Sequence, residues 1–251
     1  MFWSSKCPKE VFYTKHKKVI HMYLLVLLCS LIIPIIYTAF VNDVIKRWWS
    51  FAISTSIVAT VFLAWDYMFT TAGVWWFNSN YCVGYNLLGM PIEEWIFFIF
   101  IPFVSIFTHL ILSSELPNFK LQERTSRVVS ILLILSTTLV LALNLDKLYT
   151  SINAIVLVIT IVLGSFFYPN KLKRFYMSFL VIMFPFFLVN GILTGMFTSE
   201  PVVWYNDVEN LQIRILTIPV EDFGYAFSML FCNLMIFEAL KTREQDVSIP
   251  Q

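Results

Sequence analysis

Two pairs of adjacent acids stand at equivalent points of a pattern that the chain contains twice. Glu93-Glu94 end the segment 74–94, and Glu221-Asp222 end the segment 202–222. Near its start each segment has Trp, a second aromatic residue and Asn in succession, and each acid pair opens a long apolar run. Acids at the edge of a membrane segment are costly, so they indicate function. The duplication predicts that two related halves build one acidic site.

Paired acids among apolar and aromatic residues predict proton chemistry on an apolar substrate. In a buried pair of carboxyl groups, repulsion between like charges lets one acid keep its proton. Such an acid can protonate an alkene, and aromatic ring faces can then stabilise the resulting cation. Simple helix capping by Pro and acids is the alternative. It explains neither the shared spacing nor the accompanying Trp and Asn residues.

The predicted catalytic residues are Glu93, Glu94, Glu221 and Asp222. The predicted supporting residues flank these acids or lie near the ends of neighbouring apolar runs: Asp66, Trp76, Phe77, Asn78, Phe97, Phe98, Asn190, Trp204, Tyr205, Asn206, Arg214 and Tyr225. Asp66 and Asn190 either bond to an acid pair or cap a helix at the membrane interface. Arg214 either pairs with Glu221 or Asp222 or anchors the chain at that interface.

Other chemistries have little support in the sequence. The three His residues have no Cys or acid at ligand spacing, so no metal site is expected. The chain has neither a glycine-rich phosphate loop nor a nucleophile-elbow pattern, and we expect no cofactor. The four Cys residues are scattered, which predicts free thiols. A net charge of +1 gives no support for a nucleic-acid partner.

The elements that position the acids are expected to be membrane-spanning helices. The chain is 59% hydrophobic and 13% charged, unlike a soluble domain. Runs of about 20 apolar residues can span a bilayer, and a helix satisfies its own backbone groups there. The predicted spans are Val19–Val41, Trp48–Phe69, Ile92–Leu112, Val128–Leu145, Ile152–Tyr168, Phe175–Ile192 and Val220–Leu240.

The repeat gives these seven spans an order. We expect an all-α integral membrane protein in which two parallel three-helix repeats are joined by a connector helix, so both acid pairs face the same side. The Lys and Arg residues are divided between the two sides, which leaves the orientation open. The expected divisions are a basic N-terminal segment (1–18), the first repeat (19–112), a linker with the connector (113–150), the second repeat (151–240) and a polar tail (241–251).

Both halves resemble a known family. The first half carries Trp65-Asp66-Tyr67-Met68-Phe69-Thr70, Gly73 to Asn78, and Pro91-Ile92-Glu93-Glu94 with Phe97-Phe98. The second carries Asn190 to Thr194, Pro201 to Asn206, Arg214, and Pro219-Val220-Glu221-Asp222 with Tyr225. Over about residues 20–240 the chain is similar to the small membrane lycopene β-cyclases, in the form that fuses their two subunits.

This resemblance implies a carotenoid biosynthesis enzyme, an isomerase-type intramolecular lyase that takes a lipophilic polyene from the bilayer without net redox change. An acid would protonate a terminal double bond of lycopene, the cation would close a ring, and a base would remove a proton. The four acids would supply donor and acceptor, with Asn78 and Asn206 orienting them. The expected location is a bacterial-type cytoplasmic membrane, with a homo-oligomer or other carotenoid-pathway enzymes as partners.

Three alternatives stay open at this point. A proton-coupled membrane carrier also combines repeats with buried acids, although several spans here are almost free of polar residues. A related carotenoid cyclase could use another substrate or form another ring type. A non-catalytic partner subunit is the third possibility, against which stands the presence of two complete acid motifs in one chain.

Overall fold

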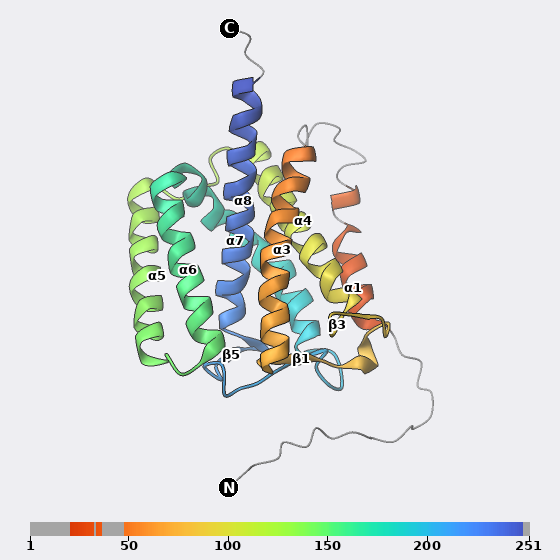
Figure 1. Cartoon of the computed structure of the whole chain (residues 1–251). Coiled ribbons are helices and arrows are strands. Elements are labelled where there is room, and N and C mark those ends of the chain that lie inside the picture. Colours follow the sequence, from red (N-terminus) through yellow and green to blue (C-terminus); the bar gives the residue numbers. More distant parts are fainter. Residues whose placement is uncertain (1–20, 33, 37–47, 248–251) are drawn as a thin grey trace, which may run out of the picture.

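The structure, a computed structural model, describes residues 21–32, 34–36 and 48–247 (Figure 1). Within this part the chain is mostly helical. The α-helices are α1 (Met22–Ser30), α3 (Trp48–Ala72), α4 (Ile92–Glu115), α5 (Glu123–Leu143), α6 (Leu148–Phe167), α7 (Pro169–Leu193) and α8 (Glu221–Val247), and a single 3₁₀ turn, η1, covers Ser79–Tyr81.

Six helices, α3 to α8, are long and apolar enough to cross a membrane. They correspond to the second to seventh predicted spans, so a helical membrane protein is confirmed for this part of the chain. The first predicted span, Val19–Val41, coincides with the shorter apolar helix at Met22–Ile36, and part of it lies outside the described residues.

Several helices extend beyond the apolar runs that predicted them. α5 begins at Glu123 instead of Val128, where Arg127 forms an ion pair with Glu123 one turn away. α7 begins at Pro169 instead of Phe175, because Pro is well suited to the first turn of a helix. α8 continues to Val247, into the predicted tail. Polar residues can continue a helix outside the bilayer, so hydropathy marks the membrane segment and not the helix end.

Three small antiparallel ladders interrupt the helices, and the sequence did not predict them. β1 (Trp75–Phe77) pairs with β4 (Val203–Tyr205), β2 (Asn86–Leu87) with β3 (Met90–Pro91), and β5 (Arg214–Ile215) with β6 (Ile218–Pro219). The last two are hairpins that lead directly into α4 and α8. Figure 1 shows the labelled strands gathered at one end of the helix bundle.

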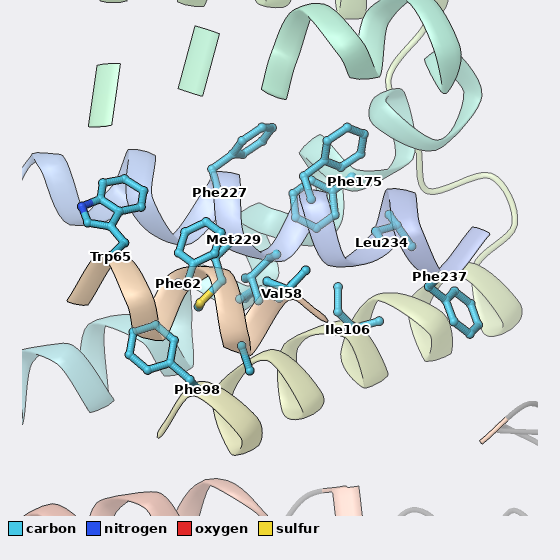
Figure 2. Packing of buried hydrophobic residues seen from close by; sticks show 14 of the residues in the cluster. Val58, Phe62, Trp65, Phe98, Ile106, Phe175, Phe227, Met229, Leu234 and Phe237 are labelled. Carbon is cyan, nitrogen blue, oxygen red and sulfur yellow. The ribbon is translucent and has the colours of Figure 1, made fainter. Parts of the chain in front are cut away.

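A core rich in aromatic side chains holds the helices together. Figure 2 shows Phe62 of α3 beside Met229 of α8, whereas Phe227 points to the other side of α8, where its ring packs against Phe175 of α7. α6 packs between α5 and α8, and Gly164 allows close approach, because a Cβ there would clash with the Phe231 ring. α5 lies at the edge of the bundle, and most of its surface is exposed. The core thus fixes α3, α4, α7 and α8, the helices that carry the predicted acids and their neighbours.

Candidate active site

The β1–β4 ladder joins the two copies of the duplicated pattern directly. Its register pairs Trp75 with Tyr205, Trp76 with Trp204 and Phe77 with Val203. Side chains alternate between the faces of a strand. Trp76 and Trp204 therefore lie on one face, stacked with ring centroids 6.5 Å apart and half exposed. Their four neighbours in the ladder all line a cavity on the other face.

Asn78 and Asn206 lock this crossing on both sides. The backbone N–H of Asn78 donates to Val202 O and that of Asn206 to Val74 O, both at 2.8 Å. The side-chain amides reach across as well, to Pro201 O (3.3 Å) and Gly73 O (3.2 Å). Neither amide bonds to one of the predicted acids among the described residues. Their donors instead connect the two copies, so any role in orienting the acids stays a prediction.

The first acid of each pair binds the loop that precedes its hairpin. Glu93 accepts a hydrogen bond from Val83 N, and Glu221 accepts one from Leu211 N at 2.7 Å. Glu221 also accepts from the Thr150 hydroxyl at 2.7 Å. Both carboxyls are buried and neither lines the cavity. In this structure these two acids hold the loops before the hairpins against the helix starts.

The second acid of each pair faces the cavity. Successive residues on a helix point about 100° apart, so only one of two adjacent acids can face the same space. Glu94 and Asp222 both line the cavity, although they belong to different halves of the chain. The structure thus brings together one acid from each predicted pair.

The two cavity-facing acids have different partners. Glu94 accepts a hydrogen bond from the Tyr23 hydroxyl of α1. Asp222 accepts three: from Tyr149 at 2.6 Å, from Tyr205 at 2.9 Å and from the Asn190 amide at 3.2 Å. Tyr205 lies in β4, outside the membrane spans, and burial raises the pKa of its phenol well above the usual value, with a further contribution from Asp222. Tyr205 therefore stays a hydrogen-bond donor.

Asp66 of α3 adds a third acid to the cavity, beside Glu94. Its Oδ1 accepts a hydrogen bond from Trp75 Nε1 at 2.6 Å, and its buried Oδ2 has no partner. The Asp66 and Glu94 carboxyls interact electrostatically. No Lys or Arg side chain lines this cavity among the described residues. The first half of the site therefore holds two carboxyls with few hydrogen-bond donors.

Aromatic rings form much of the remaining wall. Tyr225, Phe97, Phe98 and Phe77, all predicted from the sequence, line the cavity. Tyr225 packs against Trp65 at 4.8 Å between centroids, and its buried hydroxyl has no partner. Along α4 the lining runs from Glu94 to Ser105, which corresponds to about 16 Å at the rise of an α-helix. The cavity thus leads from the acids toward the middle of the bundle.

Arg214 lies outside this cavity and has its own partners. Its guanidinium pairs with Asp207 at 2.7 Å, donates to Thr217 O and lies 5.6 Å from the Tyr205 ring centroid. It pairs with neither acid of the second motif. Among the described residues, no three His, Cys, Asp or Glu side chains converge in a way that could hold a metal ion.

The family model described as lycopene cyclase matches residues 20–112 and 146–240, which together form most of the chain. The chain belongs to the lycopene cyclase family. No curated protein and no solved structure matches it. The two matched ranges each end with a helix that carries one acid pair, as the resemblance of both halves had implied.

Membership of the lycopene cyclase family makes the protein an enzyme of carotenoid biosynthesis with a lipophilic substrate. Together with the six apolar helices, it identifies a multi-pass membrane protein. The recognition drawn from the sequence is thereby confirmed at the level of the family.

Several residues that contact the cavity acids of this lycopene cyclase family member were not predicted from the sequence. Tyr23 and Tyr149 each donate to a cavity-facing acid, and each lies at the start of an apolar helix in its half of the chain. The repeat gave no signal for them, because the 128-residue offset aligns Tyr23 with Ser151 and not with Tyr149. Trp75 was missed because Trp76 matches Trp204 in the repeat, whereas strand alternation turns Trp75 and not Trp76 toward the cavity.

Proposed function

We propose that the protein closes a ring at the end of a linear polyene such as lycopene by proton transfer, through a carbocation. Glu94 and Asp66 form the donor side, and Asp222 forms the acceptor side. The observation that carries this proposal is the unequal hydrogen bonding of two acid clusters that face one aromatic cavity.

Asp222 has the environment of a base. An ionised carboxylate can only accept hydrogen bonds, and hydrogen bonds to the charged form favour it. The three donors around Asp222 therefore stabilise its carboxylate form. A carboxylate held in this way is ready to accept a proton from a cation beside it.

Asp66 and Glu94 have the environment of an acid. Two carboxyls that interact in a cavity without a cation share a proton, because both cannot ionise at the same time. Asp66 Oδ2, which is buried without a partner, has room to carry that proton. The Tyr23 hydroxyl donates to Glu94 and holds that carboxyl toward the cavity.

The reaction needs one proton in and one proton out. The donor side adds a proton to the terminal double bond of the polyene, which leaves a tertiary cation. The electron pair of a neighbouring double bond attacks this cation and closes a six-membered ring, and the positive charge moves onto the ring. Asp222 then removes a proton from the ring. The electron pair of the broken C–H bond forms the new ring double bond. The product is an isomer of the substrate.

Ring faces stabilise the cation between these two steps. Tyr225 and Phe98 line the cavity with all three acids, and aromatic faces attract a positive charge within about 6 Å. The rest of the polyene would extend along α4 and α7, whose cavity-lining residues run toward the middle of the bundle. An apolar substrate can then reach the acids without leaving the membrane.

This function fits a layout of seven spans in two repeats. We infer that the first apolar run, Val19–Val41, forms the seventh span. Its described part, α1, packs on α4 and α7 and places Tyr23 against Glu94. Divisions at 1–18, 19–112, 113–150, 151–240 and 241–251 then make α5 the connector. A bacterial-type cytoplasmic membrane, with either a second copy of the chain or other carotenoid-pathway enzymes as partners, completes the proposal.

Expression in bacteria that make lycopene tests the function directly. We expect the red pigment to be replaced by a product with β-type rings, identified by chromatography against standards of each ring type. Cultures in heavy water should give a product with deuterium on the closed ring. Unchanged lycopene, despite well-folded protein in the membrane, would count against the proposal, and another ring type would assign a related cyclase.

Family membership favours the enzyme over a proton-coupled carrier. In the same bacteria, a carrier would leave the pigment chemically unchanged.

A further inference from the structure

The tips of the two hairpins carry leucine in a backbone conformation that disfavours it. Leu88 (φ 53°) and Leu216 (φ 59°) both lie in the left-handed region. There the Cβ of a residue other than glycine crowds the backbone, so Gly, Asn or Asp usually occupies such turns. The same strained choice occurs at equivalent points of both hairpins. A strained residue that recurs in this way indicates a function for its side chain.

Both leucines are also exposed. Leu88 is 61% and Leu216 69% accessible, and the neighbouring Leu87 and Ile215 are exposed as well. In water, an apolar side chain at a tip gains nothing that would offset the strain. In an apolar medium the leucine side chain is removed from water, and this burial of apolar surface is favourable and can offset the strain.

The hairpins lie where the bilayer could reach them. β3 packs on α4, and β6 packs on α7 and α8. α7 exposes Leu180, Phe184 and Leu188 on its outer surface. Figure 1 shows β3 at the height of the first turns of α1, not beyond the ends of the helices. Trp95 of α4 donates from its indole N–H to Leu87 O at 3.3 Å, and tryptophan is enriched at the membrane interface.

We propose that the tips of both hairpins, Leu87-Leu88 and Ile215-Leu216, insert into the acyl-chain region of the surrounding bilayer. The two tips would then hold the acid end of the bundle at a fixed depth. Residues 1–20 are the alternative cover within the chain, but they contain five lysines. A basic segment of that kind is poorly suited to cover apolar tips. This proposal does not depend on the reaction, so it can fail or succeed independently of the proposed function.

Quenching of a fluorescent label tests the insertion. Full-length protein with its four Cys residues changed to Ser would carry Leu88→Cys or Leu216→Cys, labelled with an environment-sensitive dye, in phosphatidylcholine vesicles. Leu135→Cys on the exposed side of α5 and Asn80→Cys in η1 provide the lipid and water references. We expect nitroxides on the acyl chains to quench both tips several-fold more than aqueous iodide does, as at Leu135.

Dominant quenching by iodide would place the tips in water and overturn the proposal. Quenching by neither agent would mean that protein covers them, either residues 1–20 or a second copy of the chain, and would overturn it equally.

A second variant avoids labelling. Asn tolerates the left-handed region and is polar, so Leu88→Asn with Leu216→Asn should leave the unfolding midpoint in detergent unchanged or raised. The gain in midpoint on transfer from detergent to vesicles should be smaller than for the unaltered chain. An equal gain in both proteins would contradict the insertion.

Discussion

The two halves of the chain form the same backbone hydrogen bonds around the cavity but differ in the side chains around the acids. Equivalent hydrogen bonds occur in both: Val83 N to Glu93 and Leu211 N to Glu221, and Ile92 N to Tyr85 O and Val220 N to Ile213 O. The side chains around the two cavity-facing acids, in contrast, differ between the halves. The first half has a second carboxyl, Asp66, whereas the second has an amide, Asn190, and a phenol, Tyr205. A conserved frame with changed side chains can separate a proton donor from a proton acceptor.

Replacing the cavity-facing acids should have the largest effect. Glu94→Gln and Asp222→Asn keep the shape of the side chain but remove its ability to transfer a proton. We expect each to lower the rate of ring closure by about 10²–10⁴-fold, the usual contribution of general acid–base catalysis. Pigment conversion per amount of folded protein measures the effect.

The matched controls are Glu93→Gln and Glu221→Gln, which keep an acceptor oxygen for the loop before the hairpin. They should retain most of the activity. Stronger losses in these two variants than in Glu94→Gln and Asp222→Asn would reverse the assignment of the acids.

Replacing Glu93 or Glu221 by alanine should lower the unfolding midpoint by different amounts in the two halves. Glu221→Ala leaves two donors without an acceptor, Thr150 Oγ1 and Leu211 N, whereas Glu93→Ala leaves only Val83 N. An unsatisfied buried donor costs about 1–3 kcal/mol. We therefore expect Glu221→Ala to lower the unfolding midpoint more than Glu93→Ala. An equal or opposite order would show that the Thr150 contact contributes nothing.

The stacked rings of Trp76 and Trp204, at the centre of the β1–β4 ladder, should make a smaller contribution to stability than the buried acids. Trp76→Ala, Trp204→Ala and the double variant form a double-mutant cycle. Because both rings are half exposed, we expect a coupling of about 0.5–1.5 kcal/mol, typical of aromatic pairs. Additive losses of unfolding free energy in the double variant would exclude a direct interaction.

Removing the ion pair between Arg214 and Asp207, which occurs in the second half, should have the smallest effect on stability. The first half has Ser79 and Asn86 where the second has Asp207 and Arg214, so only the second can form it. Burial is the largest single influence on the pKa of Asp207 and raises it, but the hydrogen bonds from Arg214 and Asn210 and the charge of Arg214 together outweigh it, so the net shift is downward. The pair should therefore contribute stability above the usual aspartate pKa and lose it as the pH falls through the lowered value.

Asp207→Asn should remove this pH dependence and cost no more than about 1 kcal/mol, the usual range of an exposed pair. Unfolding midpoints at neutral and acidic pH measure it. A variant that keeps the full pH dependence of the unaltered chain would show that another group titrates.

The sequence predicted the features that depend on composition and repetition. Apolar runs located six helices, and the repeat selected the two segments whose acids meet in one cavity. It could not decide which acid of each pair faces that cavity, because adjacent residues differ only in their angle around the helix. Nor could it predict strands of two or three residues, which are too short for a periodic pattern. Tyr23 and Tyr149 were missed because single tyrosines at span ends are typical of the interface belt.

The register of β1 and β4 has a consequence for the origin of the chain. Its middle pair joins Trp76 to Trp204, and the outer pairs are related by exchange of the two strands. This is the isologous contact that two identical polypeptides make around a two-fold axis. A half-length ancestor could therefore have formed the same ladder as a homodimer. Fusion of two such copies would make that encounter intramolecular, and each half would then be free to diverge without having to fit its own twin.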